Sequence, residues 1–219
     1  SVSAFLLNRS SDLIECHEYY RRRIYSLSGS NNNMFSNNIV ELNAAVTTMS
    51  IAGSSTSDYN TEGFFGQLQY NYDNKYFASA SYRRDASSYF DPDHRWGNFW
   101  SIGGAWLLNK EAWFNVSWLD ELKLKASYGE QGNDRIGYYN YITTYNIVNS
   151  NGALALTPRQ LGNSKISWEK GGEFNIGLEF AALNSRLSGS VEYYYRKTSD
   201  MLSWFSLPAS FGFTGYYDN

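Results

Sequence analysis

The 219-residue sequence is poor in cysteine, in long apolar runs and in surplus charge, and each shortage excludes a class of protein. Its single cysteine, Cys16, excludes a disulfide within the chain and a thiolate metal cluster. No apolar run reaches the roughly 18 residues that indicate a transmembrane helix. With 18 Lys and Arg against 21 Asp and Glu, the sequence lacks the basic excess of a nucleic-acid-binding protein. A transmembrane barrel remains compatible, because its strands alternate apolar and polar residues.

Such an alternation, with a period of two residues, is present and predicts β-strands. In residues 120–130, for example, Leu122 and Leu124 lie on one face while Lys123 and Lys125 lie on the other. The predicted strands cover residues 63–72, 75–84, 99–108, 120–130, 172–182 and 185–198. They are about ten residues long, which exceeds the roughly 5–6 usual in soluble proteins and matches the roughly 9–11 that cross a bilayer. The aromatic residues, 18% of the chain, gather near the strand ends, as in the girdles of transmembrane barrels.

The connections between these strands are of two kinds. Asp73-Asn74 and Leu183-Asn184 are expected to form tight turns, and residues 109–119 a link of moderate length. Long loops are expected over residues 85–98, over 131–171 and after 198. If the strands are antiparallel, short connections lie on one side and long loops on the other. Outer-membrane barrels have this asymmetry, with short periplasmic turns and long external loops.

The N-terminal part of the chain has a less regular pattern. Residues 1–7 are expected to end one strand and residues 12–24 to form another, with a turn at 8–11. Residues 26–61, rich in Ser and Asn, are interpreted as a third long loop that holds a short helix within VELNAAVTTM. Because Ser1 falls inside an alternating pattern, we expect the chain to be a segment of a longer protein.

Several of these stretches resemble the SusC/RagA-type TonB-dependent transporters of the Bacteroidetes outer membrane. GFFGQLQYNYDNKYFASASYRRDASSYF, at 63–90, resembles the family's strand–turn–strand that ends in Arg-x-Asp-Gly-Ser-Ser-x-Phe. WLDELKLKASYGEQGND, at 118–134, is similar to the family's Leu-Lys-Leu-Arg-x-Ser-Tyr-Gly motif, and residues 168–202 resemble its late hairpin. The resemblance covers about 62–215 in order, with Ala86 and Lys125 where the family usually has Gly and Arg.

The resemblance implies an all-β fold, namely an antiparallel transmembrane β-barrel of about 22 strands, of which this chain is a part. The plug, the TonB box and the C-terminal strands of such a transporter are not in the sequence, so residues 1–219 are expected to belong to one barrel domain. The implied function is active import of a nutrient across the outer membrane, most often a glycan fragment and sometimes a peptide. The implied partners are a SusD-like surface lipoprotein, the TonB–ExbB–ExbD complex and outer-membrane lipid, with no cofactor and no nucleic acid.

In such a barrel the two faces of each strand have different surroundings. A Lys or Arg on the lipid face costs roughly 2–4 kcal/mol at the midplane, so charged residues are expected to face the lumen. These are Arg83, Lys123, Lys125, Glu179, Glu192 and Arg196. Aromatic residues of the external loops are candidates for contact with substrate or partner, since a ring suits the apolar face of a sugar and a protein interface equally. These are Tyr89, Phe90, Trp96, Tyr138, Tyr139 and Tyr141.

Catalytic and metal sites receive little support from the sequence. Asp91, Asp93 and His94 are close in sequence, but Pro92 separates them and no EF-hand spacing follows, so they are interpreted as a solvated loop. With only 2 His and no Gly-x-Ser-x-Gly elbow, the chain is not expected to be an enzyme. Arg83 and Asp85 are expected to pair with each other or with neighbours at the rim of the barrel. A passive porin or a β-barrel adhesin remains the alternative, and a membrane-anchored hydrolase ranks last.

Overall fold

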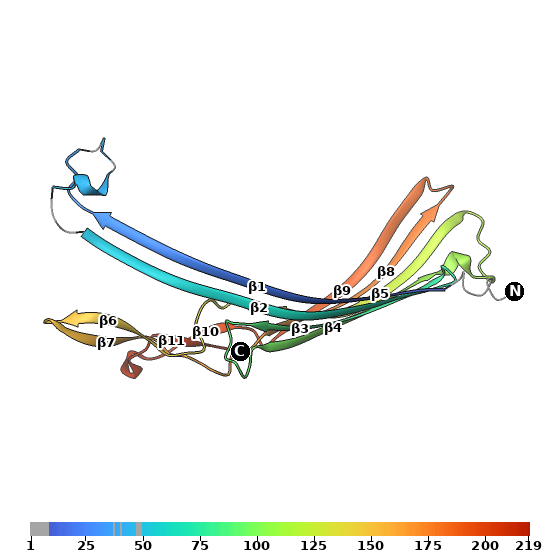
Figure 1. The fold of residues 1–219 in the computed structure, drawn as a ribbon. Coiled ribbons are helices and arrows are strands. Elements are labelled where there is room, and N and C mark those ends of the chain that lie inside the picture. The colour runs from blue at the N-terminus through green and yellow to red at the C-terminus, as the bar shows by residue number, and fades with distance from the viewer. Residues whose placement is uncertain (1–8, 37, 40, 47–49) are drawn as a thin grey trace.

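The structure, a computed structural model, describes residues 9–36, 38–39, 41–46 and 50–219. Its main element is a seven-stranded antiparallel sheet in the order β1-β2-β3-β4-β5-β8-β9. Two small two-stranded sheets, β6–β7 and β10–β11, accompany it. Figure 1 shows the large sheet curled into an open half-barrel, with the β1–β2 hairpin reaching far past the other strands of that sheet. The predicted fold class, a partial antiparallel β-barrel, is thus confirmed.

Each of the six predicted strands is present in the large sheet, generally with longer bounds. The strands of that sheet are β1 (Arg9–Asn31), β2 (Ser50–Tyr72), β3 (Tyr76–Ser87), β4 (Trp96–Leu107), β5 (Leu119–Asn133), β8 (Glu169–Ala182) and β9 (Leu187–Ser199). The small sheets consist of β6 (Thr144–Ser150) with β7 (Ala153–Gln160) and β10 (Ser203–Ser206) with β11 (Gly215–Asp218). The described helices are the 3₁₀ turns η1 (Leu42–Ala44), η2 (Leu108–Lys110) and η3 (Ala209–Phe211). None of the helices in the described residues has the length and apolar character to span a membrane.

The N-terminal part differs from the prediction. Residues 9–11, predicted as part of a turn, begin β1, and much of 26–61, predicted as a loop, belongs to β1 and β2. Of the stretch predicted to hold a short helix, the structure describes residues 41–46, and their helical part is the single turn η1. The two strands pair without a register shift from Arg9↔Tyr72 to Asn31↔Ser50, so main-chain hydrogen bonds hold this Ser- and Asn-rich hairpin together. The strand end and the turn residue predicted within 1–8 lie outside the described residues.

The long external loops also contain more structure than predicted. The loop between β5 and β8 holds the β6–β7 hairpin, which turns at Asn151 (φ 51°) and Gly152 (φ 84°). Positive φ at both turn residues is the requirement of a type I′ hairpin turn, which Asn-Gly satisfies. The segment after β9 forms the β10–β11 hairpin, and the Asn163 side chain donates hydrogen bonds to Tyr217 O (3.1 Å) and Asp218 Oδ1 (2.8 Å). The external segments therefore hold one another in place.

The short connections lie together at the opposite end of the sheet, as predicted. Both tight turns have positive φ at their central residues, 58° and 47° at Asp73 and Asn74 and 58° at Leu183 and Asn184. The link between β4 and β5 is anchored by Glu111, whose side chain is only 11% exposed. Its carboxylate accepts hydrogen bonds from the Tyr76 hydroxyl and Trp106 Nε1 (2.9 Å), and Lys75 Nζ lies 3.4 Å away. These donors, the Tyr76 hydroxyl foremost, lower the pKa of Glu111 from its ordinary value.

Glu111 should therefore stabilise the barrel in a pH-dependent way. A carboxylate whose pKa is lowered by folding adds stability above its ordinary pKa, and this stability is lost as the pH falls through the lowered value. We expect Glu111→Gln to lower the melting temperature of the full-length protein by a few degrees at pH 7, and the difference to shrink as the pH falls below about 4.3, the ordinary pKa of a glutamate. Heat-modified mobility on gels between pH 3 and pH 8 measures this. The exposed Glu121→Gln serves as the control, and a difference for Glu111→Gln that is constant with pH would contradict the assignment.

Candidate translocation surface

The register of the sheet sorts the side chains into two faces. Partners in an antiparallel ladder point to the same side, so Lys125 shares a face with its neighbours Gly177 and Glu192 across β8 and β9. The next row, Ala126 with Ile176 and Tyr193, lies on the other side. We call the first side the polar face and the second the apolar face. The apolar face carries the exposed large hydrophobic side chains of β3, β4 and β8, namely Tyr76, Tyr82, Trp96, Trp100, Ile102, Phe174, Ile176 and Leu178.

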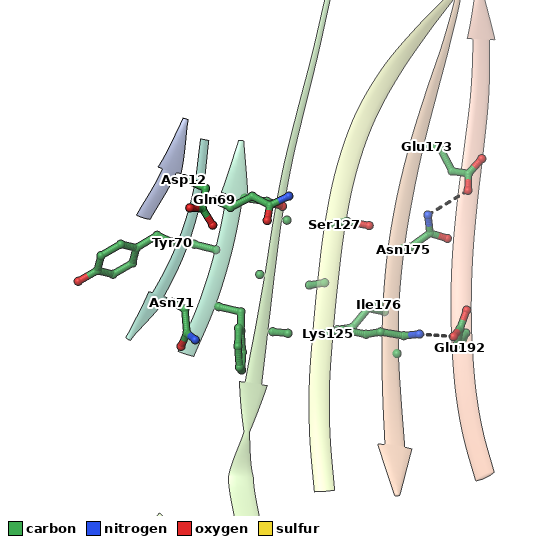
Figure 2. A pocket seen from close by; sticks show the side chains of 18 of the residues that line it. Asp12, Gln69, Tyr70, Asn71, Lys125, Ser127, Glu173, Asn175, Ile176 and Glu192 are labelled. Carbon is green, nitrogen blue, oxygen red and sulfur yellow. Dashed lines mark hydrogen bonds and ion pairs between the residues drawn. The ribbon is translucent and has the colours of Figure 1, made fainter. Parts of the chain in front are cut away.

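The six charged residues expected in the lumen all lie on the polar face. Alternation and register place Arg83, Lys123, Lys125, Glu179, Glu192 and Arg196 on that side. A hollow of about 860 Å³ is lined by residues from all seven strands of the large sheet, among them Asp12, Gln69, Ser127 and Glu173 on the polar face. Figure 2 shows these side chains spread over neighbouring strands. A hollow shared by seven strands requires the sheet to curve around it, so the polar face is the concave one.

Charges on this face neutralise one another in a row across β5, β8 and β9. Glu179 accepts hydrogen bonds from Lys123 Nζ (3.1 Å) and Lys125 Nζ (2.7 Å), and Lys125 also binds Glu192, the contact that Figure 2 marks. Two cations thus meet two anions, and all four side chains remain partly exposed. Exposed pairs of this kind add little stability, about 0–1 kcal/mol each. These ion pairs supply the polar face with hydrogen-bonding groups without adding a net charge to this row.

A second hollow, of about 320 Å³, lies on the same face nearer to the long loops. Arg83, Asp85, Glu130 and Trp168 contribute to its lining. Arg83 Nε lies 2.7 Å from Asp85 Oδ2, and Arg83 Nη2 lies 3.2 Å from Glu18 Oε2, so Arg83 makes both kinds of pair that the prediction allowed, with Asp85 and with a neighbour. The polar face therefore offers paired charges from the short-turn end toward the long loops.

The long loops share a small hydrophobic core, which we call the loop core. It consists of Phe90, Phe99, Ile136, Ile166 and Trp168. The ring centroids of Phe90 and Trp168 are 5.5 Å apart, and Trp168 Nε1 donates a hydrogen bond to the Arg95 carbonyl (2.8 Å). The β3–β4 loop and the β5–β8 loop are thereby joined into one body at the long-loop end of the sheet.

The aromatic residues predicted to contact substrate or partner have different surroundings. Phe90 is 0% exposed, and its side chain packs inside the loop core. Trp96 was placed in a loop by the prediction, but it begins β4 on the apolar face, where the Arg84 guanidinium lies 4.9 Å from its ring centroid. Tyr141 packs against the loop core. Whether any of the six touches a ligand stays a prediction.

Three of the six do come together. The rings of Tyr89, Tyr138 and Tyr139 contact one another in series, and they join Tyr20 and Tyr59 of the β1–β2 hairpin. Those two tyrosines were missed: Tyr59 lay in residues 26–61, interpreted as a loop, and Tyr20 lay in the predicted strand 12–24 without a predicted partner strand. The pairing of β1 with β2 brings these two rings together. It joins residues far apart in the sequence, so no local pattern could have revealed it.

The Asp91–His94 stretch is a turn, as interpreted from the sequence. The His94 amide donates to the Asp91 carbonyl (2.9 Å), the Asp93 amide donates to Asp91 Oδ1 (3.1 Å), and residues 92–94 are exposed. Among the residues that the structure describes, no group of three or more His, Cys, Asp or Glu side chains is arranged to hold a metal ion.

Known proteins match this chain over most of its length. Residues 11–219 match the family model for the TonB dependent receptor-like, beta-barrel family. TonB-dependent receptor P39 of Formosa agariphila is 34% identical over 187 residues, and TonB-dependent receptor SusC of Bacteroides thetaiotaomicron is 33% identical over 160 residues. These alignments cover 84% and 68% of this chain, but only 17% and 16% of the two relatives.

The fold matches solved structures equally well. The structure of the RagAB peptide transporter superposes with a TM-score of 0.88 at 31% identity, covering 97% of this chain and 24% of that chain. The same transporter solved in an open state gives a TM-score of 0.86. The two-faced sheet, the loop asymmetry and these matches agree with one another. The chain therefore belongs to the TonB-dependent receptor β-barrel family of the outer membrane, and it is of the SusC/RagA type.

Proposed function

We propose that this chain forms part of the wall of one outer-membrane barrel domain, in a transporter that imports a nutrient with energy supplied through TonB. The observation that carries the proposal is the two-faced sheet, with its apolar face on the outside of the curve and its polar face lining the hollow. Lipid is a suitable neighbour for the first face, and a water-filled lumen for the second. Membership of the TonB-dependent receptor family supports the same orientation.

The six charged residues of the polar face, Arg83, Lys123, Lys125, Glu179, Glu192 and Arg196, are proposed to face the lumen. Ion pairs and amide groups such as Gln69 and Asn175 supply hydrogen-bonding partners there. They suit a hydroxyl-rich or amide-rich solute, so a glycan fragment is our first candidate for the substrate and a peptide the second. The RagAB relative is a peptide transporter, which supports the second.

The partners follow from the same proposal. A SusD-like surface lipoprotein would contact the external loops, and TonB–ExbB–ExbD would act through the N-terminal part of the full transporter. The named relatives are receptors and transporters, and the chain is proposed to supply wall and loops rather than chemistry.

Uptake should depend on TonB. We expect a strain that carries the transporter to take up a labelled glycan or peptide that a transporter-deletion strain does not. Deleting TonB should reduce that uptake to the level of the deletion strain, and restoring TonB on a plasmid should recover it. Uptake that continues unchanged without TonB would contradict energy-coupled import and would favour the passive porin.

A further inference from the structure

Five tyrosines and one arginine meet where the β1–β2 hairpin leaves the sheet. The rings of Tyr20, Tyr59, Tyr89, Tyr138 and Tyr139, here called the tyrosine cluster, contact one another in that order. Their successive centroid distances are 6.2, 4.4, 5.2 and 6.2 Å. Two of the rings come from the hairpin and three from the long loops. Segments far apart in the sequence therefore build one continuous aromatic surface.

The cluster lies on the same face as the two hollows. Tyr20 and Tyr59 alternate in register with the polar-face residues of β1 and β2, and no bulge interrupts the pairing of these strands. The last partner of β2 on β3 is Ser87, paired with Thr61, so Tyr59 lies just beyond the end of β3. A solute that approached the polar face from the long-loop side would reach the tyrosine cluster before it reached either hollow.

The cluster is held in a fixed arrangement. The Tyr59 hydroxyl donates to Asp134 Oδ2 (2.9 Å), and the Ser87 hydroxyl donates to the same oxygen (2.7 Å). The rings at the two ends, Tyr20 and Tyr139, are 46% and 39% exposed. A surface whose rings are already ordered loses little conformational entropy when a ligand binds.

Arg22 supplies a cation that is not neutralised. Its guanidinium lies 5.4 Å from the Tyr59 ring centroid, and Nη2 donates a hydrogen bond to the Tyr138 hydroxyl (3.2 Å). The neighbouring Arg23, on the other face, is paired with Asp58 at 2.6 Å. Within the described part of the chain, no carboxylate lies at ion-pair distance from Arg22. Its charge is therefore held by neutral groups and remains able to bind an anion.

We infer that the tyrosine cluster and Arg22 form a binding site for an oligosaccharide whose sugar ring carries a carboxylate. An exposed tyrosine ring presents an apolar face to the C–H groups of a sugar, and its hydroxyl reaches the sugar's polar edge. The Arg22 guanidinium matches a carboxylate in two-pronged geometry. The inference rests on the proposed function for its position at the outer mouth, and it narrows the substrate class to acidic glycans.

Binding to the purified full transporter tests the inference. Isothermal titration calorimetry would compare trimers of galacturonate, glucuronate and mannuronate with their neutral methyl esters. We expect at least one acid to bind about tenfold more tightly than its ester. Arg22→Gln should abolish that preference, and Tyr139→Leu or Tyr20→Leu should weaken acid and ester alike by about fivefold.

Two variants of the same hairpin are matched controls. Arg21→Gln makes the same charge change on the opposite face of β1, and Tyr25→Leu removes a 66% exposed ring from that opposite face. Both should bind as the wild type does, and heat-modified mobility would verify that every variant is folded. The inference is overturned if no acid is preferred to its ester, if Arg21→Gln acts as Arg22→Gln does, or if a peptide displaces the sugar at equal concentration.

The binding test and the uptake test fail independently. Calorimetry on the purified protein needs no TonB, so a lost TonB dependence would refute the proposed import and leave the binding site standing. Absence of acid preference with TonB-dependent uptake intact would refute the binding site alone.

Discussion

Replacing Phe90 by alanine should destabilise the outer loops by about 3–5 kcal/mol, the usual cost of removing a fully buried phenylalanine side chain. Phe90 is 0% exposed and belongs to the loop core that joins the β3–β4 loop to the β5–β8 loop. The cavity left by the ring would separate Trp168 from its neighbour and loosen both loops. Amide hydrogen exchange over residues 134–168 should accelerate roughly a hundredfold to several thousandfold if these loops open as a unit.

A control for this variant is available at the other end of the barrel. Trp113 is 65% exposed beside the short turns, so Trp113→Ala should leave exchange in the outer loops unchanged. Exchange that stays slow in Phe90→Ala would show that the loop core does not hold the loops together. The variant also separates two roles, because Phe90 should affect loop order whereas Tyr139 should affect ligand binding alone.

Placing an arginine at Ala126 should cost about 2–4 kcal/mol of folding free energy in the bilayer, because Ala126 lies at the middle of β5 on the apolar face. Its register partner Ile176 is apolar as well, so no nearby anion would compensate the buried charge. Urea titration of the full barrel in lipid vesicles measures the difference, and the amount of heat-modifiable protein in the outer membrane provides a cellular measure.

The adjacent residue provides the matched control. Ser127 lies on the polar face, opposite Asn175, so Ser127→Arg should fold nearly as well as the wild type. Equal destabilisation by the two substitutions would mean that the faces are assigned wrongly. The comparison is sharp because the two positions share a strand, a depth and a backbone environment and differ only in the direction of the side chain.

The strands between residues 63 and 198 could be predicted because the two faces of each strand have different surroundings. This difference leaves a period-two alternation of apolar and polar residues in the sequence. The outer parts of β1 and β2 carry Ser, Asn and Gly on both sides, so their pairing depends on main-chain hydrogen bonds that leave no such pattern. The β6–β7 hairpin did leave a signal, the Asn151-Gly152 pair, which the prediction overlooked.

The candidate site was predictable to a similar extent. Arg83 and Asp85 lie two residues apart on one strand and therefore share a face, so their pairing follows from local sequence. The site formed by the tyrosine cluster and Arg22 requires Arg22 to lie opposite Tyr59 and two long loops to fold back onto the base of the hairpin. Contacts between residues so far apart are set by the tertiary fold, and they cannot be predicted from the local patterns of a single sequence.

The β1–β2 hairpin has a mechanical consequence. Residues 50–60 of β2 extend beyond the end of β3, which at about 3.4 Å per residue makes a free arm of about 37 Å. A rotation of about 10° at the base would move the tip of an arm of that length by about 6 Å. The hydrogen bonds from Arg22 to Tyr138 and from Tyr59 to Asp134 join the base of this arm to the loop beside it. Contacts at the base therefore fix the direction of the arm, because a small rotation at the base produces a large displacement of the tip.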